Sequence, residues 1–569
     1  VLLVVSWFGT VLRAGLCEIR PCVETDAKDT APLVWRVCGQ TRAEARVVSQ
    51  IAGAPAYGGT PSDDSVLEAI AALKARGYKV GLYPFVMMDI PAGSTLPDPW
   101  GGAAQPAYPW RGRITCDPAP GRPATADRTA AAAAQIDAFF GAAQASDFAV
   151  ADGAISYAGP AEWGFRRHIL HYARLAQAAG GVDSFVIGSE LVGLTRLRDA
   201  AGGFPAVQKL RALAADVRAV LGPASHITYA ADWTEYGGYA PPDAPGDLRF
   251  PLDDLWADAA ISCIGLDWYA PLGDWRGGDG GLDASLAPGP HDRIYLDAQV
   301  EGGEGCDWVY ASPADREGQT RTPVTDSLGK PWVWRVKDLA AWWANPHVER
   351  VAGVERPSPT AWIPQSKPIW FTECGVPAVD RGANQPNVFF DPKSVESALP
   401  HHSSGARDDL IQRRALEALL GHWQPEAGRN PASGLYAGRM IDPDRLHLWC
   451  WDGRPYPQFP ALSAVWSDGA NWARGHWLTG RIASSSLAAV VADVCRRAGL
   501  ATVDAAGLDG VVAGLVIDGP QSARAVLEPL MAAYGFDARE RDGVLSVFHL
   551  DREAPLDLAA DRLAITRDG

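Results

Sequence analysis

The chain has 569 residues, of which 47% are hydrophobic and 21% charged, so it can bury a large core and has room for more than one domain. Its formal net charge of -16 argues against a nucleic-acid-binding protein, because such proteins contact phosphates with clustered Lys and Arg. No run of about 18 apolar residues occurs, as a membrane-spanning helix requires. We therefore expect a globular protein without direct nucleic-acid contact and without a transmembrane segment.

Up to about residue 460, short apolar runs alternate with helical patterns, which is typical of repeated βα units around a parallel sheet. The clearest unit is a helix from Pro61 to Arg76, with Val66, Ile70 and Leu73 on one face, followed by a strand from Lys79 to Met88. A weaker strand is predicted near residues 46–51, and eight strands are predicted in all. The other six predicted strands are Leu2 to Trp7, Ser184 to Glu190, His226 to Asp232, Ile261 to Trp268, Lys367 to Glu373 and Arg445 to Trp451.

Eight nearly continuous apolar strands favour a closed (β/α)8 TIM barrel. An open doubly wound sheet is the rival architecture, but the chain has no GxGxxG after its first strand and no P-loop. Two insertions interrupt the pattern, at Pro91 to Arg128 and at Pro271 to about Trp332. In a barrel such loops follow strands and lie on the catalytic face.

The pattern changes after about residue 480. Helices are predicted at Leu487 to Ala498 and Ser522 to Tyr534, and Phe536 to Phe548 is predicted as a hairpin that turns at Asp542-Gly543. We therefore expect two domains, a barrel at residues 1–465 and part of a small α+β domain at residues 480–569.

Two glutamates end otherwise apolar strands, where the side chains of a barrel point into the active site. Glu190 ends the fourth predicted strand and Glu373 the seventh. Glycoside hydrolysis needs two carboxyl groups on either side of the bond, roughly 5 Å apart in a retaining enzyme. The pair predicts a glycoside hydrolase.

These positions resemble the large clan of retaining β-glycosidases with (β/α)8 barrels. The resemblance implies that Glu190 is the general acid/base and Glu373 the nucleophile, and that Tyr269 orients the nucleophile. Many clan members have Asn before the acid/base, where it contacts the sugar's 2-position; this chain has Ser189 there.

Aromatic residues supply further candidates for sugar contacts, because the 22 Trp of the chain are an excess and flat aromatic faces suit sugar rings. Trp233 follows the fifth strand and Trp268 ends the sixth. Either Trp449 or Trp451, at the end of the eighth, is expected to form the floor of a sugar subsite. For any single Trp, ordinary packing is the alternative.

Four segments together resemble the TIM-barrel-like domain of gene transfer agent and phage tail proteins: residues 58–63 (GGTPSD), 302–305 (GGEG), 366–373 (SKPIWFTE) and 382–387 (GANQPN). The resemblance implies a hub or baseplate component of a phage-like particle, a barrel that acts as a cell-wall glycosidase, and a tail-hub domain after residue 480. It also implies other baseplate proteins as partners, a ring homo-oligomer, and action at the bacterial envelope.

The favoured hypothesis is a retaining β-glycosidase that cleaves peptidoglycan or a related surface glycan. A non-catalytic structural or glycan-binding barrel is the alternative, which Ser189 and the Trp excess also fit. A peptidase or amidase is weaker, because no zinc ligands and no Ser/His/Asp or Cys/His set are apparent. We expect no metal and no organic cofactor. The nine Cys are scattered and mainly free, with pairing of Cys17 and Cys22 left open.

Overall fold

The structure is a computed structural model that describes residues 1–151, 154–278, 281–481, 485–500 and 502–550. Its centre is an eight-stranded sheet of β1 (Leu2–Gly9), β2 (Ile19–Arg20), β9 (Gly81–Met88), β12 (Ser184–Ser189), β13 (His226–Asp232), β14 (Ile264–Trp268), β19 (Ile369–Cys374) and β20 (Ile441–Leu448). The spatial order is β2-β1-β9-β12-β13-β14-β19-β20. All neighbours are parallel except β2, which is antiparallel to β1.

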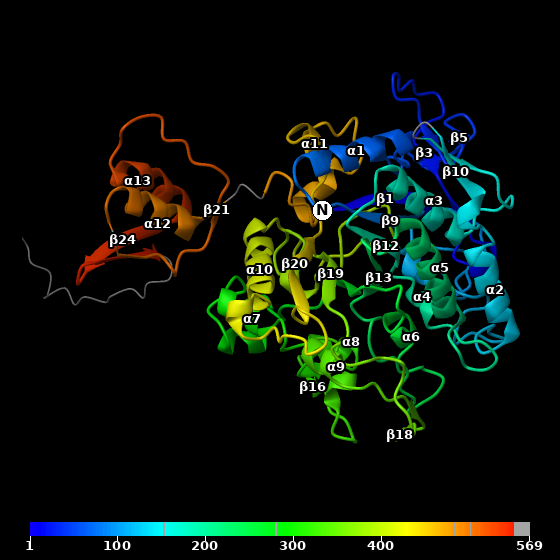
Figure 1. Cartoon of the computed structure of the whole chain (residues 1–569). Coiled ribbons are helices and arrows are strands. Elements are labelled where there is room, and N and C mark those ends of the chain that lie inside the picture. The colour runs from blue at the N-terminus through cyan, green and yellow to red at the C-terminus, as the bar shows by residue number, and fades with distance from the viewer. Residues whose placement is uncertain (152–153, 279–280, 482–484, 501, 551–569) are drawn as a thin grey trace, which may run out of the picture.

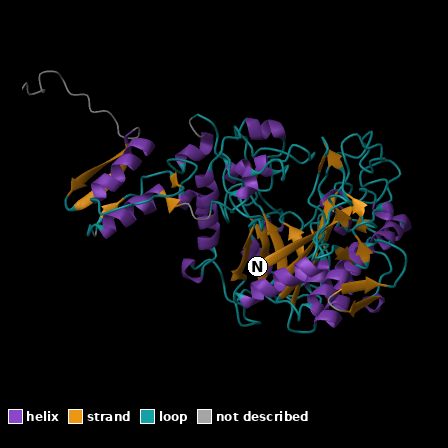
Figure 2. Ribbon diagram, turned by 90° about the horizontal axis from the view of Figure 1, so that it is seen from above, coloured by secondary structure: helices purple, strands orange, loops and turns teal. Residues whose placement is uncertain are grey.

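Helices lie outside this sheet (Figures 1 and 2). Their apolar faces share one core with the outward side chains of the strands; Ile70, Leu170 and Leu210, for example, are fully buried. The helices of this part are α1 (Asp63–Ala75), α2 (Ala130–Phe140), α3 (Phe165–Ala178), α4 (Val192–Thr195), α5 (Pro205–Leu221), α6 (Asp253–Trp256), α7 (Arg293–Ala298), α8 (Pro313–Glu317), α9 (Leu339–Ala344), α10 (Asp409–His422) and α11 (Gln458–Ala461).

A second, smaller core fills the interior of the barrel. Tyr83 and Phe85 from β9 pack there with Val186 from β12 and with Trp449, which follows β20. At the opposite end, Arg445 of β20 forms a bidentate ion pair with Asp183, directly before β12, at 2.5 and 3.0 Å. Contacts between strands far apart in the sheet order show that the sheet curls around, and the predicted TIM barrel is confirmed.

The predicted strand at residues 46–51 does not belong to the barrel. Val47 and Ile51 are 36% and 40% exposed, whereas a barrel strand is covered on both faces. The segment contributes to short ladders instead, as do several loops: β3 (Cys22–Val23) with β6 (Arg46–Val47), β4 (Arg36–Val37) with β5 (Gln40–Thr41), β7 (Gln50–Ile51) with β8 (Ala54–Pro55), β10 (Phe148–Ala151) with β11 (Ala154–Tyr157), β15 (Trp308–Val309) with β16 (Thr322–Pro323), and β17 (Arg350–Val351) with β18 (Val354–Glu355). Glu190 therefore follows the third parallel strand of the sheet and Glu373 lies in the sixth, and two strands separate these two.

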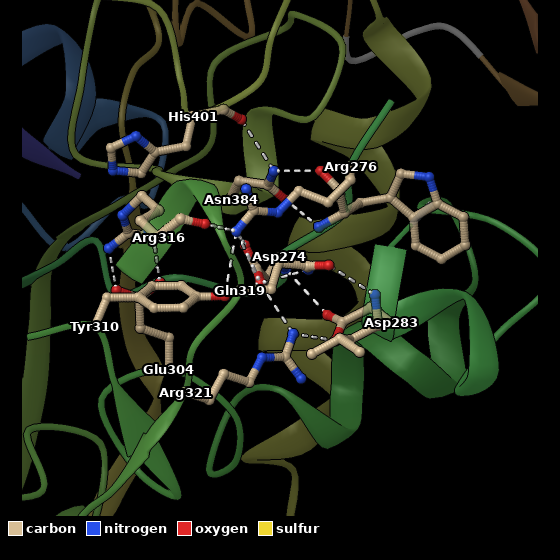
Figure 3. Close-up of polar contacts among 12 residues, drawn as sticks. Asp274, Arg276, Asp283, Glu304, Tyr310, Arg316, Gln319, Arg321, Asn384 and His401 are labelled. Atoms are coloured by element: carbon tan, nitrogen blue, oxygen red, sulfur yellow. Dashed lines mark hydrogen bonds and ion pairs between the residues drawn. The ribbon is translucent and has the colours of Figure 1, made fainter. Parts of the chain in front are cut away.

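The second insertion, after β14, is held by a buried ion network around Asp274 (Figure 3). Asp274 is 2% exposed and accepts hydrogen bonds from Tyr310 at 2.6 Å and Arg321 at 2.9 Å, and it pairs with Arg276 at 3.1 Å. Next to it, the Asn384 amide bonds to both backbone polar groups of Trp275. The network thus joins the insertion to the segment that follows β19.

Replacing Asp274 by Asn is expected to lower the free energy of unfolding by about 3 kcal/mol, because the change leaves buried guanidinium groups short of a counter-charge. Denaturant unfolding measures the loss. Asp137→Asn is the matched control, since its ion pair with Lys209 is exposed and is expected to contribute less than about 1 kcal/mol. Equal stability of the two variants would show that the network does not hold the insertion.

Residues 485–500 and 502–550 form a separate small core built by Val491 of α12, Leu527 of α13 and Val547 of β25, among others. Figure 1 shows these elements to one side of the barrel. They are β21 (Ser485–Ser486), α12 (Leu487–Arg497), β22 (Val503–Asp504), β23 (Val511–Val512), α13 (Ala523–Tyr534), β24 (Phe536–Arg541) and β25 (Val544–His549). We propose a domain boundary after Arg481, because Arg481 still pairs with Asp409 of α10.

Within the described ranges, no helix combines the length and the apolar character that crossing a membrane would need.

Candidate active site

The two predicted glutamates lie at the carboxyl ends of β12 and β19. Every residue of these strands is buried, and Glu190 and Glu373 are themselves only 8% and 5% exposed. Glu190 has a φ of +50°, a left-handed conformation that costs a non-glycine residue about 1–3 kcal/mol. Its N–H donates to the carbonyl of Ala230 in β13 at 2.8 Å, which helps to hold it there. Both carboxyl groups are thus fixed by rigid elements.

The first insertion supplies the immediate partners of Glu190. Oε2 of Glu190 accepts a hydrogen bond from the Trp110 indole at 2.6 Å and forms an ion pair with Arg111 at 2.8 Å. Arg111 begins the 3-10 helix η2 (Arg111–Arg113), and its Nε also donates to the hydroxyl and carbonyl oxygens of Ser189, each at 3.0 Å. The guanidinium stacks 3.7 Å above the ring of Phe85. Arg111 therefore joins Ser189 and Glu190 to the barrel wall.

One carboxylate oxygen of Glu373 accepts a hydrogen bond, and the other has no partner among the described residues. Tyr269 donates its hydroxyl to Oε2 at 2.7 Å, whereas Oε1 is buried and accepts no hydrogen bond from the described residues. Burial and the nearby charge of Glu190 raise the pKa of Glu373 to about 7. Burial and the charge of Glu373 raise the pKa of Tyr269 well above its ordinary value, so Tyr269 stays a donor.

Asp267 of β14 is a third buried carboxyl group beside the pair. It accepts from Tyr83 at 2.9 Å and from Thr372 at 2.8 Å, and it is fully buried. Burial and the charge of Glu373 raise the pKa of Asp267 well above its usual range. Since Asp267 does not line the cavity described next, its role is to organise the wall behind the two glutamates.

Glu190, Glu373 and Tyr269 line one cavity of about 770 Å³, which also borders Arg111 and Asp232. That volume lies within the range of small-molecule sites. Aromatic side chains contribute much of the wall: Tyr57, Phe85, Tyr108, Trp110, Trp449 and Trp477. Phe85 and Trp449 stack with their ring centroids 5.9 Å apart. The arrangement offers two carboxyl groups and flat apolar surfaces to one ligand.

The structure separates the predicted sugar-contacting residues into two groups. Tyr269 and Trp449 line the cavity, and Ser189 lies behind Glu190, bonded to Arg111. Three tryptophans lie elsewhere. Trp451 is 62% exposed and outside the cavity, because β20 ends at Leu448 and strand alternation stops there. Trp268 packs on Phe371 in the outer core, and Trp233 borders a different pocket.

Sequence patterns missed Arg111, and the excess of Trp in the chain did not single out Trp110. Both come from the first insertion, about 80 residues before Glu190, and no local spacing links them to it. The length of the insertion and its expected place on the catalytic face were the available signal.

Among the described residues, no group of three or more His, Cys, Asp or Glu is arranged to hold a metal ion. All nine Cys are free, including Cys17 and Cys22. Cys374, next to Glu373, is fully buried and donates to the His447 carbonyl, so it is a core residue.

Comparisons with known proteins agree with the architecture. The model of the GTA TIM-barrel-like domain matches residues 163–460, and a model described as "Putative phage tail protein" matches residues 522–569. No curated protein sequence matches the chain.

Similar solved structures include a complex of a GH113 β-1,4-mannanase, which is 16% identical over 84% of each chain with a TM-score of 0.33. A second GH113 β-1,4-mannanase structure is 17% identical over 74% of this chain and 77% of its own, with a TM-score of 0.30. The GH113 β-mannanase AaManA from Alicyclobacillus acidocaldarius, in complex with ManMIm, is 14% identical over 84% and 81%, with a TM-score of 0.32.

Proposed function

The chain belongs to the family of GTA TIM-barrel-like domains, and from this premise we propose that it is a tail component of a phage-like particle whose barrel is a retaining β-glycosidase. Its substrate is peptidoglycan or another β-linked glycan of the cell surface, met during entry. The observation that carries the proposal is the pair of glutamates on one cavity, with Oε1 of Glu373 unpartnered and Oε2 held by Tyr269.

In this mechanism Glu190 protonates the leaving oxygen while Oε1 of Glu373 attacks the anomeric carbon, which gives a glycosyl-enzyme. Glu190 then removes a proton from water, and that water hydrolyses the intermediate with net retention. Tyr269 fixes the plane of the Glu373 carboxylate. Trp449 and Phe85 supply apolar faces on which a sugar ring packs.

The test is to incubate the full chain with purified sacculi and with β-linked oligosaccharides of defined composition, and to measure new reducing ends. Proton NMR of the first product distinguishes the anomers. Release of the β-anomer supports the proposal. Release of the α-anomer would indicate an inverting reaction, and no release from any glycan would contradict catalysis.

Replacing Tyr269 by Phe is expected to reduce kcat/KM by about 10- to 100-fold, the effect of losing one hydrogen bond to a charged group. The lost O–H stabilised the ionised form of Glu373, so the pKa of Glu373 rises further. If ionised Glu373 is the nucleophile, the acid limb of the pH profile, near pH 7 in the unmodified chain, moves upward.

Tyr57→Phe is the control for this experiment, because Tyr57 lines the same cavity but donates to the Met88 carbonyl. Its acid limb is expected to stay in place. An unmoved limb in the Tyr269 variant would contradict the assigned contact.

A second candidate function is a glycan-binding barrel without catalysis. The observation that favours it is that Trp110 and Arg111 both occupy Oε2 of Glu190, the group that has to deliver a proton. Under this alternative, variants of either glutamate assemble and bind glycan like the unmodified chain, and no fragment is released.

The match of residues 522–569 to a phage tail model supports a place in the tail, with other tail or baseplate proteins as partners. We extend the proposal to a gene transfer agent baseplate hub, assembled as a ring of identical chains and acting at the bacterial envelope. Electron microscopy of particles that carry a labelled chain tests this location.

A further inference from the structure

The cavity that holds the two glutamates is acidic. Three Lys or Arg side chains line it, and each is already paired with a carboxylate of the same wall: Arg111 with Glu190, Lys393 with Asp391, and Arg454 with both Asp452 and Asp468. Seven acidic side chains line it in all: Glu190, Asp232, Glu373, Asp391, Glu396, Asp452 and Asp468. A ligand therefore meets an excess of negative charge and no unpaired cation on the lining.

Apart from Glu190 and Glu373, Asp232 is the lining carboxylate that has an oxygen without a partner among the described residues. Its Oδ1 accepts from the N–H and the hydroxyl of Thr234, at 2.9 and 2.5 Å. Its Oδ2 receives no hydrogen bond and forms no ion pair with the described residues, although the side chain is only 9% exposed. The remaining exposure is toward the cavity that Asp232 lines. Oδ2 is not among the fully buried unpartnered acceptors, so a donor on a ligand in the cavity can reach it.

Asp232 lies in the part of the cavity wall that is next to Glu190. It ends β13, two residues after Ala230, whose carbonyl accepts the N–H of Glu190. Burial and the charge of Glu190 raise the pKa of Asp232 to about 6. An ammonium group at Oδ2 would relieve both the missing hydrogen bond and the repulsion from Glu190, whereas a neutral hydroxyl would relieve only the first.

We propose that Asp232 binds the ammonium group of an amino sugar in the leaving-group half of the substrate, so that the cavity selects glycans with free amino groups. This inference rests on the proposed glycosidase function and narrows its substrate to those β-linked surface glycans, peptidoglycan included, that carry free amino groups. Acidic sugars are disfavoured by the same wall, because it offers them no free cation.

Binding to the full chain carrying Glu373→Gln tests the inference without turnover. The probes are a β-1,4-linked glucosamine tetramer and its N-acetylated counterpart, and their binding is measured by calorimetry. The pH is set between the pKa of Asp232, which is about 6, and the pKa of the amino group. The glucosamine tetramer is expected to bind at least about 10-fold more tightly, and the preference is expected to shrink with added salt.

Adding Asp232→Asn is expected to abolish that preference while changing the affinity for the acetylated tetramer by less than about 3-fold. Glu396→Gln is the matched control, since it removes one charge from the same cavity at a residue already paired with Arg113. If overall acidity rather than contact with Asp232 causes the preference, both variants lose it equally, and the inference is wrong.

Equal binding of both tetramers to the chain with Asp232 intact overturns the inference alone and leaves the glycosidase proposal standing. This comparison needs no substitution at Asp232, so it decides the matter even if Asp232→Asn folds poorly. Absence of binding by both tetramers, and by sacculi, would contradict the proposed function as well.

Discussion

Replacing Glu373 by Gln is expected to reduce turnover of β-linked glycans by at least about 10⁴-fold, the order of magnitude lost when an essential nucleophile is removed. The amide has the shape of the carboxyl group and can still accept from Tyr269, but it cannot form a stable ester with the sugar. Reducing-end release from sacculi measures the loss. Glu355→Gln is the control, because Glu355 pairs with Lys330 outside the cavity.

The same variant has a second expected property, which separates loss of chemistry from loss of fold. The pKa of Glu373 is raised by burial to about 7, so its ionisation in the folded chain costs stability as the pH rises from its ordinary range through 7. Gln does not ionise. The variant is therefore expected to be more stable than the unmodified chain above pH 7 and similar to it in acid. An inactive but less stable variant at pH 8 would point to damage instead, and turnover within tenfold of the unmodified chain would remove Glu373 from the mechanism.

The sequence predicted most of the barrel because its strands are covered on both faces, and their apolar runs are unmistakable in β12, β13, β14 and β19. It failed at residues 46–51, where a run with three β-branched apolar residues resembles a strand, yet only Val48 is buried. Burial, not propensity, decides between a barrel strand and a surface ladder.

For the site, the strand ends located Glu190 and Glu373, since position along a barrel strand is visible in sequence. The partners of those glutamates were not visible. Arg111 reaches Ser189 and Glu190 from a loop that folds back over the strand ends, and only the tertiary fold brings these residues together. Similarly, alternation could not choose between Trp449 and Trp451, because it applies only while the strand continues.

Replacing Glu190 by Ala is expected to slow hydrolysis of natural glycans by about 10²- to 10⁴-fold, the usual contribution of a general acid. The loss depends on the leaving group. An aryl glycoside whose phenolate leaves without protonation is expected to form the glycosyl-enzyme at a rate close to that of the unmodified chain, and the intermediate then accumulates because no base activates water. A burst of phenolate followed by slow turnover identifies this state.

Azide provides the decisive readout for Glu190. In the Ala variant, Arg111 and Trp110 lose their shared acceptor, and a small anion can take the place of the carboxylate without needing a general base. Azide is therefore expected to restore turnover of the aryl glycoside and to yield the β-glycosyl azide. Removing Glu190 also leaves the buried guanidinium of Arg111 unpaired, which is expected to lower the free energy of unfolding by about 3–5 kcal/mol. Glu190→Gln is therefore measured alongside as the better-folded variant. If both variants lose activity equally on natural and aryl substrates and azide restores neither, Glu190 is not the acid/base, and the ion pair with Arg111 is structural.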